Sequence, residues 1–189
     1  MRKKFDMGKD VKIHPYAKII HSGINLKIDD FAQIDDFVFI YAGKMCRIGK
    51  FTHISSFTSI IGGGEFILED FAGLSAGCRI ITGSDDFSGG FLSNPTIPAK
   101  YKNVVLGRVI IRKHVIIGTN SVILPGVTVG EGATVGAMCL VSKDLDPWGI
   151  YIGPQAKKVG MRDRGGVLSR ETQFLNELKQ NPFPRLELE

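Results

Sequence analysis

Aliphatic residues recur every six positions along most of this chain. In residues 48 to 63, IGKFTHISSFTSIIGG, isoleucine stands at 48, 54 and 60. A helix would repeat near 3.6 residues and a simple strand every 2 residues, so neither explains the spacing. A period of six indicates a short strand followed by a corner. Counted from the recurring aliphatic, the hexads begin at Ile28, Ile34, Ile40, Ile48, Ile54, Ile60, Leu68, Leu74, Ile80, Val105, Ile111, Ile117, Ile123, Val129 and Val135.

A second inward position follows four residues after the first. It holds small or branched residues: Ala32, Val38, Cys46, Thr52, Thr58, Ala72, Cys78, Val109, Val115, Ser121, Val127, Ala133 and Cys139. Three such hexads close a triangular coil, and coils stack at about 4.8 Å with aliphatic ladders inside. The pattern slips by two residues twice, yet Phe31, Phe51 and Phe71 remain in equivalent places. We therefore predict one continuous parallel β-helix.

The most regular stretch, IIRKHVIIGTNSVILPGVTVGEGATVGAMCLVSKD at residues 110–144, resembles the hexapeptide-repeat acyltransferases. The galactoside, maltose, xenobiotic and surface-polysaccharide sugar acetyltransferases are the most similar members. The resemblance covers roughly residues 11–160. It implies an all-β fold, the left-handed parallel β-helix, although general crossover rules favour the right hand.

Three segments fall outside the repeat: residues 81–104, the stretch DPWGIYIGPQAKKVGMR that leaves the last coil, and the stretch LSRETQFLNELKQN. Residues 81–104, rich in Gly, Ser, Asn and Pro, form a long excursion from the coils, and such excursions are usually functional. We place the β-helix domain at 1–160 and a C-terminal helix and tail at 161–189. Ser169 is the expected helix cap, and an apolar stripe that includes Phe174 is expected to pack on the end of the β-helix. The tail NPFPRLELE is expected to fray.

Composition narrows the function classes. A chain of 189 residues suits one domain, and it has no apolar run long enough to cross a membrane. The N-terminus MRKKFDMGKD lacks the apolar stretch that follows the basic residues of a signal peptide, so we expect none. Three cysteines without metal-ligand spacing favour a reducing cytoplasm and no disulfide framework. The net charge of +5 fits anionic ligands or a solvated basic surface equally well. The four histidines lack the close pair of a gamma carbonic anhydrase, so we expect no metal.

The excursion departs from the resembling enzymes in its chemistry. Their excursion carries a histidine that deprotonates the acceptor hydroxyl, whereas this chain reads ITGSDD, with Asp85 and Asp86. One carboxylate could serve as the base if burial between subunits raised its pKa. Alternatively, an amine acceptor would bring its own nucleophile, or the aspartates would only cap a turn. His53, which points outward at the sixth hexad position, is a second candidate base, and His114 is expected to be structural.

The resemblance also implies a coenzyme A site. In the family, the pantetheine lies between subunits against small residues whose backbone it can approach closely. The matching residues here are Gly118, Thr119, Gly136, Ala137, Ser142 and Lys143. A family motif that closes over the adenine and 3′-phosphate is replaced by GPQAKKV, which retains Lys157 and Lys158 as phosphate contacts.

Together these features predict an acetyl-CoA-dependent acetyltransferase that acts as a homotrimer, with its active site between subunits. The expected acceptor is a sugar hydroxyl or amine, on a nucleotide-linked or surface-polysaccharide sugar, and no nucleic acid partner is expected. Two alternatives remain: an acetyltransferase of a small xenobiotic or free sugar, and a noncatalytic β-helix assembly module. The sequence does not distinguish O- from N-acetylation.

Overall fold

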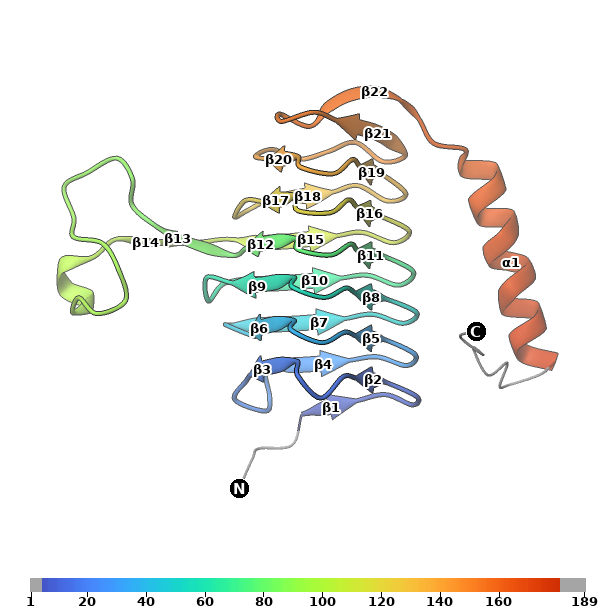
Figure 1. Cartoon of the computed structure of the whole chain (residues 1–189), viewed down its shortest axis with the longest axis horizontal. Coiled ribbons are helices and arrows are strands. Elements are labelled where there is room, and N and C mark those ends of the chain that lie inside the picture. Colours follow the sequence, from blue (N-terminus) through green and yellow to red (C-terminus); the bar gives the residue numbers. More distant parts are fainter. Residues whose placement is uncertain (1–4, 181–189) are drawn as a thin grey trace.

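Three parallel sheets wrap into one β-helix, described here for residues 5–180 of a computed structural model (Figure 1). Sheet A contains β1 (Asp6–Met7), β4 (Leu26–Ile28), β7 (Met45–Ile48), β10 (Glu65–Leu68), β15 (Arg108–Ile111) and β18 (Thr128–Val129). Sheet B contains β2 (Lys12–Ile13), β5 (Gln33–Ile34), β8 (His53–Ile54), β11 (Gly73–Leu74), β16 (Ile116–Ile117), β19 (Thr134–Val135), β21 (Gly149–Ile152) and the antiparallel β22 (Lys157–Met161). Sheet C contains β3 (Lys18–Ile20), β6 (Phe39–Tyr41), β9 (Ser59–Ile61), β12 (Arg79–Ile81), β17 (Val122–Ile123) and β20 (Leu140–Val141).

The core confirms both inward positions of the hexad. The recurring aliphatics and the residues four positions later are buried, from Ile28 and Ala32 in the lower coils to Val135 and Cys139 in the upper ones. Val105 is the exception, because it is 56% exposed and lies outside the coils. The three cysteines are buried free thiols, and burial raises the pKa of Cys46 to about 12. They therefore act as core residues.

The strand register confirms that the two-residue slips leave the stack intact. Ile28 pairs with Ile48, Ile48 with Leu68, and Leu68 with Ile111, which pairs in turn with Val129. The extra residues fall in the corner that links sheet C to sheet A, at 42–44 and 62–64. We call the three turns of each coil the A/B, B/C and C/A corners, after the sheets they join.

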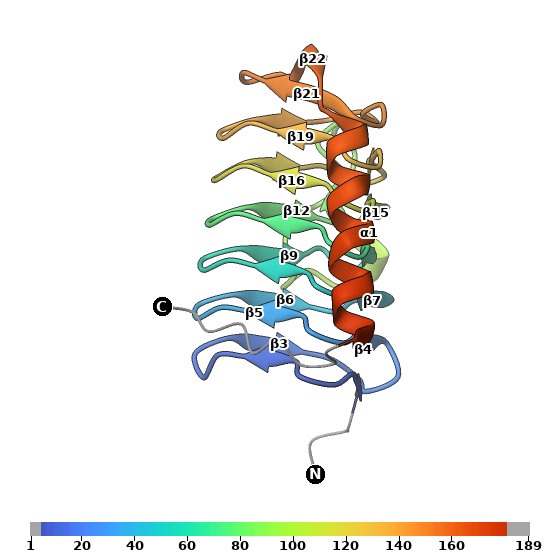
Figure 2. The same cartoon turned by 90° about the vertical axis from the view of Figure 1, so that its right-hand side faces the viewer.

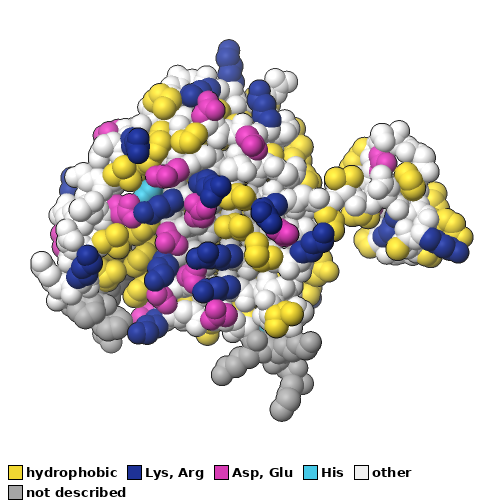
Figure 3. Space-filling model, turned by 180° about the vertical axis from the view of Figure 1, so that it is seen from behind, with side chains coloured by type: hydrophobic (Ala, Val, Ile, Leu, Met, Phe, Trp, Pro, Cys, Tyr) yellow, Lys and Arg dark blue, Asp and Glu magenta, His cyan; other side chains and the backbone are white. Residues whose placement is uncertain are grey.

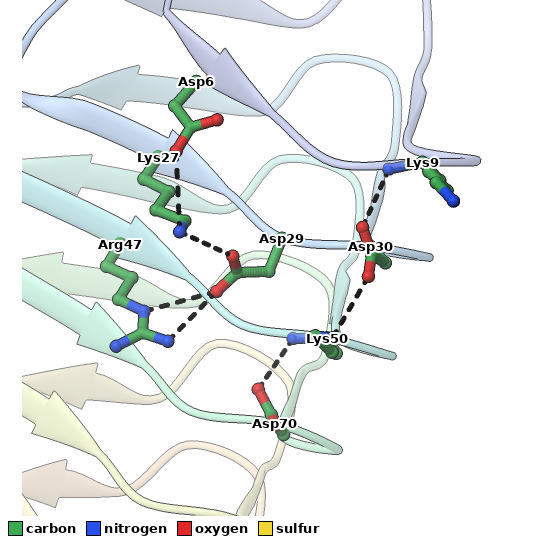
Figure 4. A network of polar contacts seen from close by, with 8 residues as sticks. All are labelled: Asp6, Lys9, Lys27, Asp29, Asp30, Arg47, Lys50 and Asp70. Carbon is green, nitrogen blue, oxygen red and sulfur yellow. Dashed lines mark hydrogen bonds and ion pairs between the residues drawn. The ribbon is translucent and has the colours of Figure 1, made fainter.

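Aspartates tie successive coils together at the A/B corner (Figure 4). The carboxylate of Asp30 accepts a hydrogen bond from the Lys9 amide at 2.9 Å, and Asp70 accepts one from the Lys50 amide at 2.8 Å. The Lys9 amide and then the Lys50 ammonium hold the pKa of Asp30 below its usual range. These bonds satisfy backbone groups that the corner leaves without a strand partner.

An aromatic ladder fills the same A/B corner. Phe31 stacks on Phe51 and Phe51 on Phe71, with ring centroids 4.8 and 5.1 Å apart, and His114 continues the stack 5.3 Å above Phe71. His114 is buried, as expected of a structural residue. The spacing follows from the coil repeat, since one ring per coil must stack at nearly the inter-strand distance.

The C-terminal helix differs from the expectation in its start and its position. Helix α1 (Arg164–Gln180) begins five residues before Ser169, because Asp163 acts as the cap and accepts a hydrogen bond from the Gly166 amide at 2.9 Å. The helix runs back along the side of the coils rather than across their end (Figure 2). Phe174 meets the Phe51 ring edge-on at 5.1 Å. The predicted frayed tail, 181–189, lies outside the described residues.

The excursion is a projecting arm and starts as a β-hairpin (Figure 1). Its stem pairs β13 (Gly83–Asp85) with β14 (Val104–Leu106) in antiparallel register, and a short 3₁₀ turn covers Ala99–Tyr101. The stem explains the exposure of Val105, which the hexad count had placed inside a coil. Large apolar side chains on the arm are exposed, among them Phe87 at 93%.

The outer faces of sheets A and C differ sharply. Acidic and basic side chains interleave across sheet A (Figure 3), with ion pairs that join Lys27 to Asp29 at 3.3 Å and Arg112 to Glu69 at 2.7 Å. On sheet C, the outward positions from β6 to β20 are Phe39, Tyr41, Ser59, Ile61, Arg79, Ile81, Val122 and Leu140. Sheet A is thus a water-facing surface, whereas sheet C from β6 to β20 is largely apolar, with Arg79 as its single charge.

Candidate functional site

Small residues from two coils meet at the B/C corner. Gly118 and Thr119 follow β16, and Gly136 and Ala137 follow β19 directly above them. The Thr119 carbonyl accepts a hydrogen bond from the Met138 amide at 2.9 Å, and a Cβ on Gly118 would lie 2.5 Å from the Ala137 nitrogen. Four of the six residues predicted to contact pantetheine are therefore adjacent, and two of them, Thr119 and Ala137, are exposed.

The two predicted phosphate contacts, Lys157 and Lys158, line one pocket near the C-terminal end of the coils, together with Lys143 from the predicted pantetheine residues. Lys143, Lys157 and Lys158 surround a space of about 460 Å³, together with Asp144 and Asp146. Lys158 pairs with Asp146 at 3.0 Å, and a hydrogen bond from that pair raises the pKa of Lys158. Lys143 and Lys157 are thus the cations available to a further anion in this pocket.

Ser142 lies one position before Lys143, in the exposed C/A corner after β20. The pantetheine residues occupy the B/C corner at the other end of the same short strand. An extended ligand that touched both groups would have to cross the outer face of sheet C near Leu140, which is 43% exposed.

The two aspartates of the excursion have different surroundings. Asp86 accepts hydrogen bonds from the Ser88 amide at 2.8 Å and from Asn103 Nδ2 at 3.0 Å. The bonds from Ser88, and then the one from Asn103, lower the pKa of Asp86, opposite to the rise that a catalytic base needs. Asp85 accepts one bond, from the Asn94 amide at 3.0 Å. Of the two, Asp85 has more accepting capacity left.

His53 points outward from sheet B and is held by a carboxylate. Its Nε2 lies 2.8 Å from Oδ2 of Asp35, one coil below. With the proton on Nε2, the Nδ1 lone pair faces away from Asp35 and can accept another proton. The next outward position above His53 is Gly73, where an added Cβ would meet no atom within 4 Å. His53 therefore lies beside an open notch.

The candidate bases do not converge within one chain. His53 lies on sheet B, whereas the arm with Asp85 leaves the C/A corner on the opposite side of the coils (Figure 1). A site that used both would need two copies of the chain. Among residues 5–180, no group of three or more His, Cys, Asp or Glu side chains is arranged to hold a metal ion.

Comparison with known proteins identifies the family. A model of the bacterial transferase hexapeptide, of six repeats, matches residues 102–143. A dTDP-4-amino-4,6-dideoxy-D-glucose acyltransferase from Escherichia coli is 36% identical over 159 residues, which are 84% of this chain and 82% of the relative. The chain belongs to the hexapeptide-repeat acyltransferases. Its β-helix is accordingly left-handed, as the resemblance implied.

Solved structures of this family extend the match in three dimensions. The N-acyltransferase AntD from Bacillus cereus, in a complex with dTDP and coenzyme A, is 38% identical, with a TM-score of 0.86. That match covers 93% of this chain and 92% of AntD. A chloramphenicol acetyltransferase from Agrobacterium fabrum is 43% identical, but over only 56 residues, 30% of this chain and 27% of the relative.

Sequence reasoning missed two features of the site region. Asp35, the partner of His53, lies about one coil earlier in the chain, so the coil period itself is the signal that could have found it. That Arg79 is the single charge among the outward positions of sheet C from β6 to β20 could be seen only after the three sheets had been assigned. No helix within residues 5–180 is long and apolar enough to span a membrane.

Proposed function

We propose that this enzyme transfers an acyl group from an acyl-coenzyme A to the amine of a nucleotide-linked amino sugar, most specifically a dTDP-linked 4-amino-4,6-dideoxy sugar. The likeness to the Escherichia coli acyltransferase along most of both chains carries this proposal. The structures of AntD with dTDP and coenzyme A support it. The net reaction forms an amide, releases the coenzyme A thiol and removes one proton from the amine.

The residues present fit coenzyme A. The small, exposed residues Thr119 and Ala137 suit an extended pantetheine chain, and the pocket lined by Lys143 and Lys157 suits its phosphates. When bound, acyl-coenzyme A supplies an activated acyl thioester. The chain's own task is then to position the acceptor amine and to receive its proton.

An amine acceptor also accounts for the missing excursion histidine. A neutral amine is already a nucleophile, so the protein needs only to orient it and accept a proton late in the reaction. Asp85 on the arm and the His53–Asp35 pair on sheet B are the two available acceptors. Because they lie on opposite sides of one chain, we place the active site between neighbouring subunits of a homotrimer.

Acyl transfer with defined acceptors tests the function. Release of free thiol from acetyl-CoA is measured with dTDP-4-amino-4,6-dideoxyglucose, with dTDP-glucose as the matched acceptor that lacks the amine, and with chloramphenicol. We expect turnover with the amino sugar alone, and a product heavier by one acetyl group in mass spectrometry. Turnover on chloramphenicol alone would favour a xenobiotic acetyltransferase. No turnover with acetyl-CoA or 3-hydroxybutyryl-CoA on any acceptor would favour the noncatalytic module.

A further inference from the structure

A second aromatic ladder at the B/C corner stops abruptly. Tyr16 stacks on Phe37 and Phe37 on Phe57, with centroids 5.7 and 5.2 Å apart and rings within 7° of parallel. All three rings are more than half exposed. The next position of the ladder is Gly77, whose amide bonds the Ser56 carbonyl at 2.9 Å and so keeps the coils in register. The ladder therefore lacks one ring.

The missing ring leaves the face of Phe57 that points away from Phe37 without a stacked ring among residues 5–180, and Phe57 is 60% exposed. Gly77 has a φ of +74°, close to the +63° and +64° of Phe37 and Phe57, so this backbone accommodates an aromatic residue elsewhere in the same ladder. Coils repeat at about 4.8 Å, which exceeds the thickness of one planar ring. Asn120, from the coil above, brings its amide oxygen to the place where a Cβ on Gly77 would lie, so its side chain fills the part of this position next to the backbone. The outer part of the position has the face of Phe57 below it and the Asn120 amide beside it.

Arg79 lies at the edge of this space, on the strand that runs from Gly77 toward the arm. Its Nη1 donates to the Phe57 carbonyl at 2.5 Å and to the Gly77 carbonyl at 2.9 Å. Arg79 is the single charge among the outward positions of sheet C from β6 to β20. A lone exposed cation on an apolar face is a natural contact for an anion.

The same stretch of chain then leads to the arm. From Gly77, β12 carries Arg79 and continues into β13, which ends at Asp85. At about 3.3 Å per residue, the path from Gly77 to Gly83 spans on the order of 20 Å. A nucleoside diphosphate sugar is an elongated ligand of base, diphosphate and sugar in that order. Along the chain, the missing ring at Gly77, the cation of Arg79 and the carboxylate of Asp85 follow one another in the same order as the base, the diphosphate and the sugar.

We propose that the gap at Gly77 binds the base of the nucleotide-linked acceptor, with Arg79 at its diphosphate. This inference rests on the proposed function and specifies where that acceptor lies. The base stacks on Phe57 and completes the ladder, and its polar edge meets the Asn120 amide, which can both donate and accept. An aromatic side chain from a second copy would fill the gap but would use neither Asn120 nor Arg79, so the observations favour the nucleotide.

Binding of dTDP and of thymidine to the full chain, measured by calorimetry, tests the site. Gly77→Phe puts the chain's own ring over Phe57 and displaces the Asn120 amide, which lies where the new Cβ would be, and we expect it to weaken both ligands at least tenfold. Arg79→Gln should weaken dTDP by a similar factor and leave thymidine unchanged. Gly153→Phe is the control, because Gly153 lies in the turn between β21 and β22 with a similar φ of +79° and open space around it. It should bind both ligands like the wild type.

Further measurements keep the test decisive. Phe57→Leu retains apolar bulk without a ring face, and should weaken both ligands about fivefold or more even if Gly77→Phe folds poorly. If wild-type enzyme acylates the amino sugar while these variants bind dTDP normally, this inference fails and the proposed function stands. If wild type neither binds dTDP nor acylates the amino sugar, the proposed function fails. A changed oligomer mass in Gly77→Phe with dTDP affinity retained would assign the gap to a second copy instead.

Discussion

Replacing Glu171 with glutamine tests how α1 is attached to the coils. Glu171 accepts hydrogen bonds from Lys113 Nζ at 2.5 Å and from His114 Nε2 at 2.9 Å, and its side chain is only 12% exposed. Burial alone would raise its pKa, but the bonds from Lys113 and His114 outweigh burial and hold it below the usual range. The negative charge of Glu171 therefore stabilises the docked helix.

The magnitude follows from these contacts. A hydrogen bond to a charged group contributes about 1.5–3 kcal/mol. Lys113 is 35% exposed, so its share is reduced by solvent screening. Glutamine keeps one acceptor and loses the charge, and we expect docking of α1 to weaken by about 1–2 kcal/mol. Amide hydrogens of α1 should then exchange about five- to thirtyfold faster, while those of the coils stay unchanged.

Hydrogen exchange read by mass spectrometry measures this effect, and pH gives a second measurement. Glu177→Gln is the matched control, because Glu177 lies on the same helix and accepts its hydrogen bond from Gln173 within that helix. A depressed pKa means that the stabilisation is complete above the unfolded value near 4.3 and disappears as pH falls through the lower folded value. Unchanged α1 exchange in Glu171→Gln would refute the attachment described here.

Three further predictions concern the active site. Asp85→Asn should lower kcat about ten- to hundredfold. Asp86→Asn should lower kcat by less, because the Asp86 carboxylate already accepts several hydrogen bonds. Full turnover in both variants, with loss of turnover in His53→Gln, would assign proton removal to His53. Ala137→Leu should abolish coenzyme A binding in calorimetry, and Lys157→Ala should weaken it about fivefold. Unchanged coenzyme A affinity in Ala137→Leu would exclude the B/C corner as the pantetheine site. Light scattering should give three times the 20.7 kDa chain mass, and a monomer at micromolar concentration would contradict an intersubunit site.

Periodicity made the coils predictable from sequence. Each inward position is constrained by the coils above and below it, so one misassigned hexad would have displaced whole ladders of side chains. Ile48 and Thr52 could therefore be placed inside the coils from the spacing alone. The helix start could not be placed in this way, because Asp163 competes with Ser169 as a cap and two glycines follow it. The hairpin stem of the arm could not be predicted either, since the β13–β14 pairing depends on contacts between residues about twenty positions apart and not on a local repeat.

The candidate site was predictable only in part. Gly118, Thr119, Gly136 and Ala137 came together because they occupy the same hexad slot in adjacent coils. The lowered pKa of Asp86 could not be predicted from ITGSDD, since the donors that lower it include Asn103, which lies near the other end of the arm's sequence. The local sequence identified the carboxylate, and the folded arm provides the hydrogen-bond donors that lower its pKa.

Departures from the repeat gather in one coil, and this supports a single functional level. The coil of β10, β11 and β12 has glycine at 73, beside His53 on sheet B, and glycine at 77, where the exposed aromatic ladder stops. The arm with Asp85 leaves the C/A corner at the end of the same coil. In a stacked repeat, each coil needs only its neighbours for stability, so stability alone gives no reason for these three exceptions to share a level. A ligand that spans the B/C corner and sheet C, completed by an adjacent subunit at sheet B, would require all three at that height.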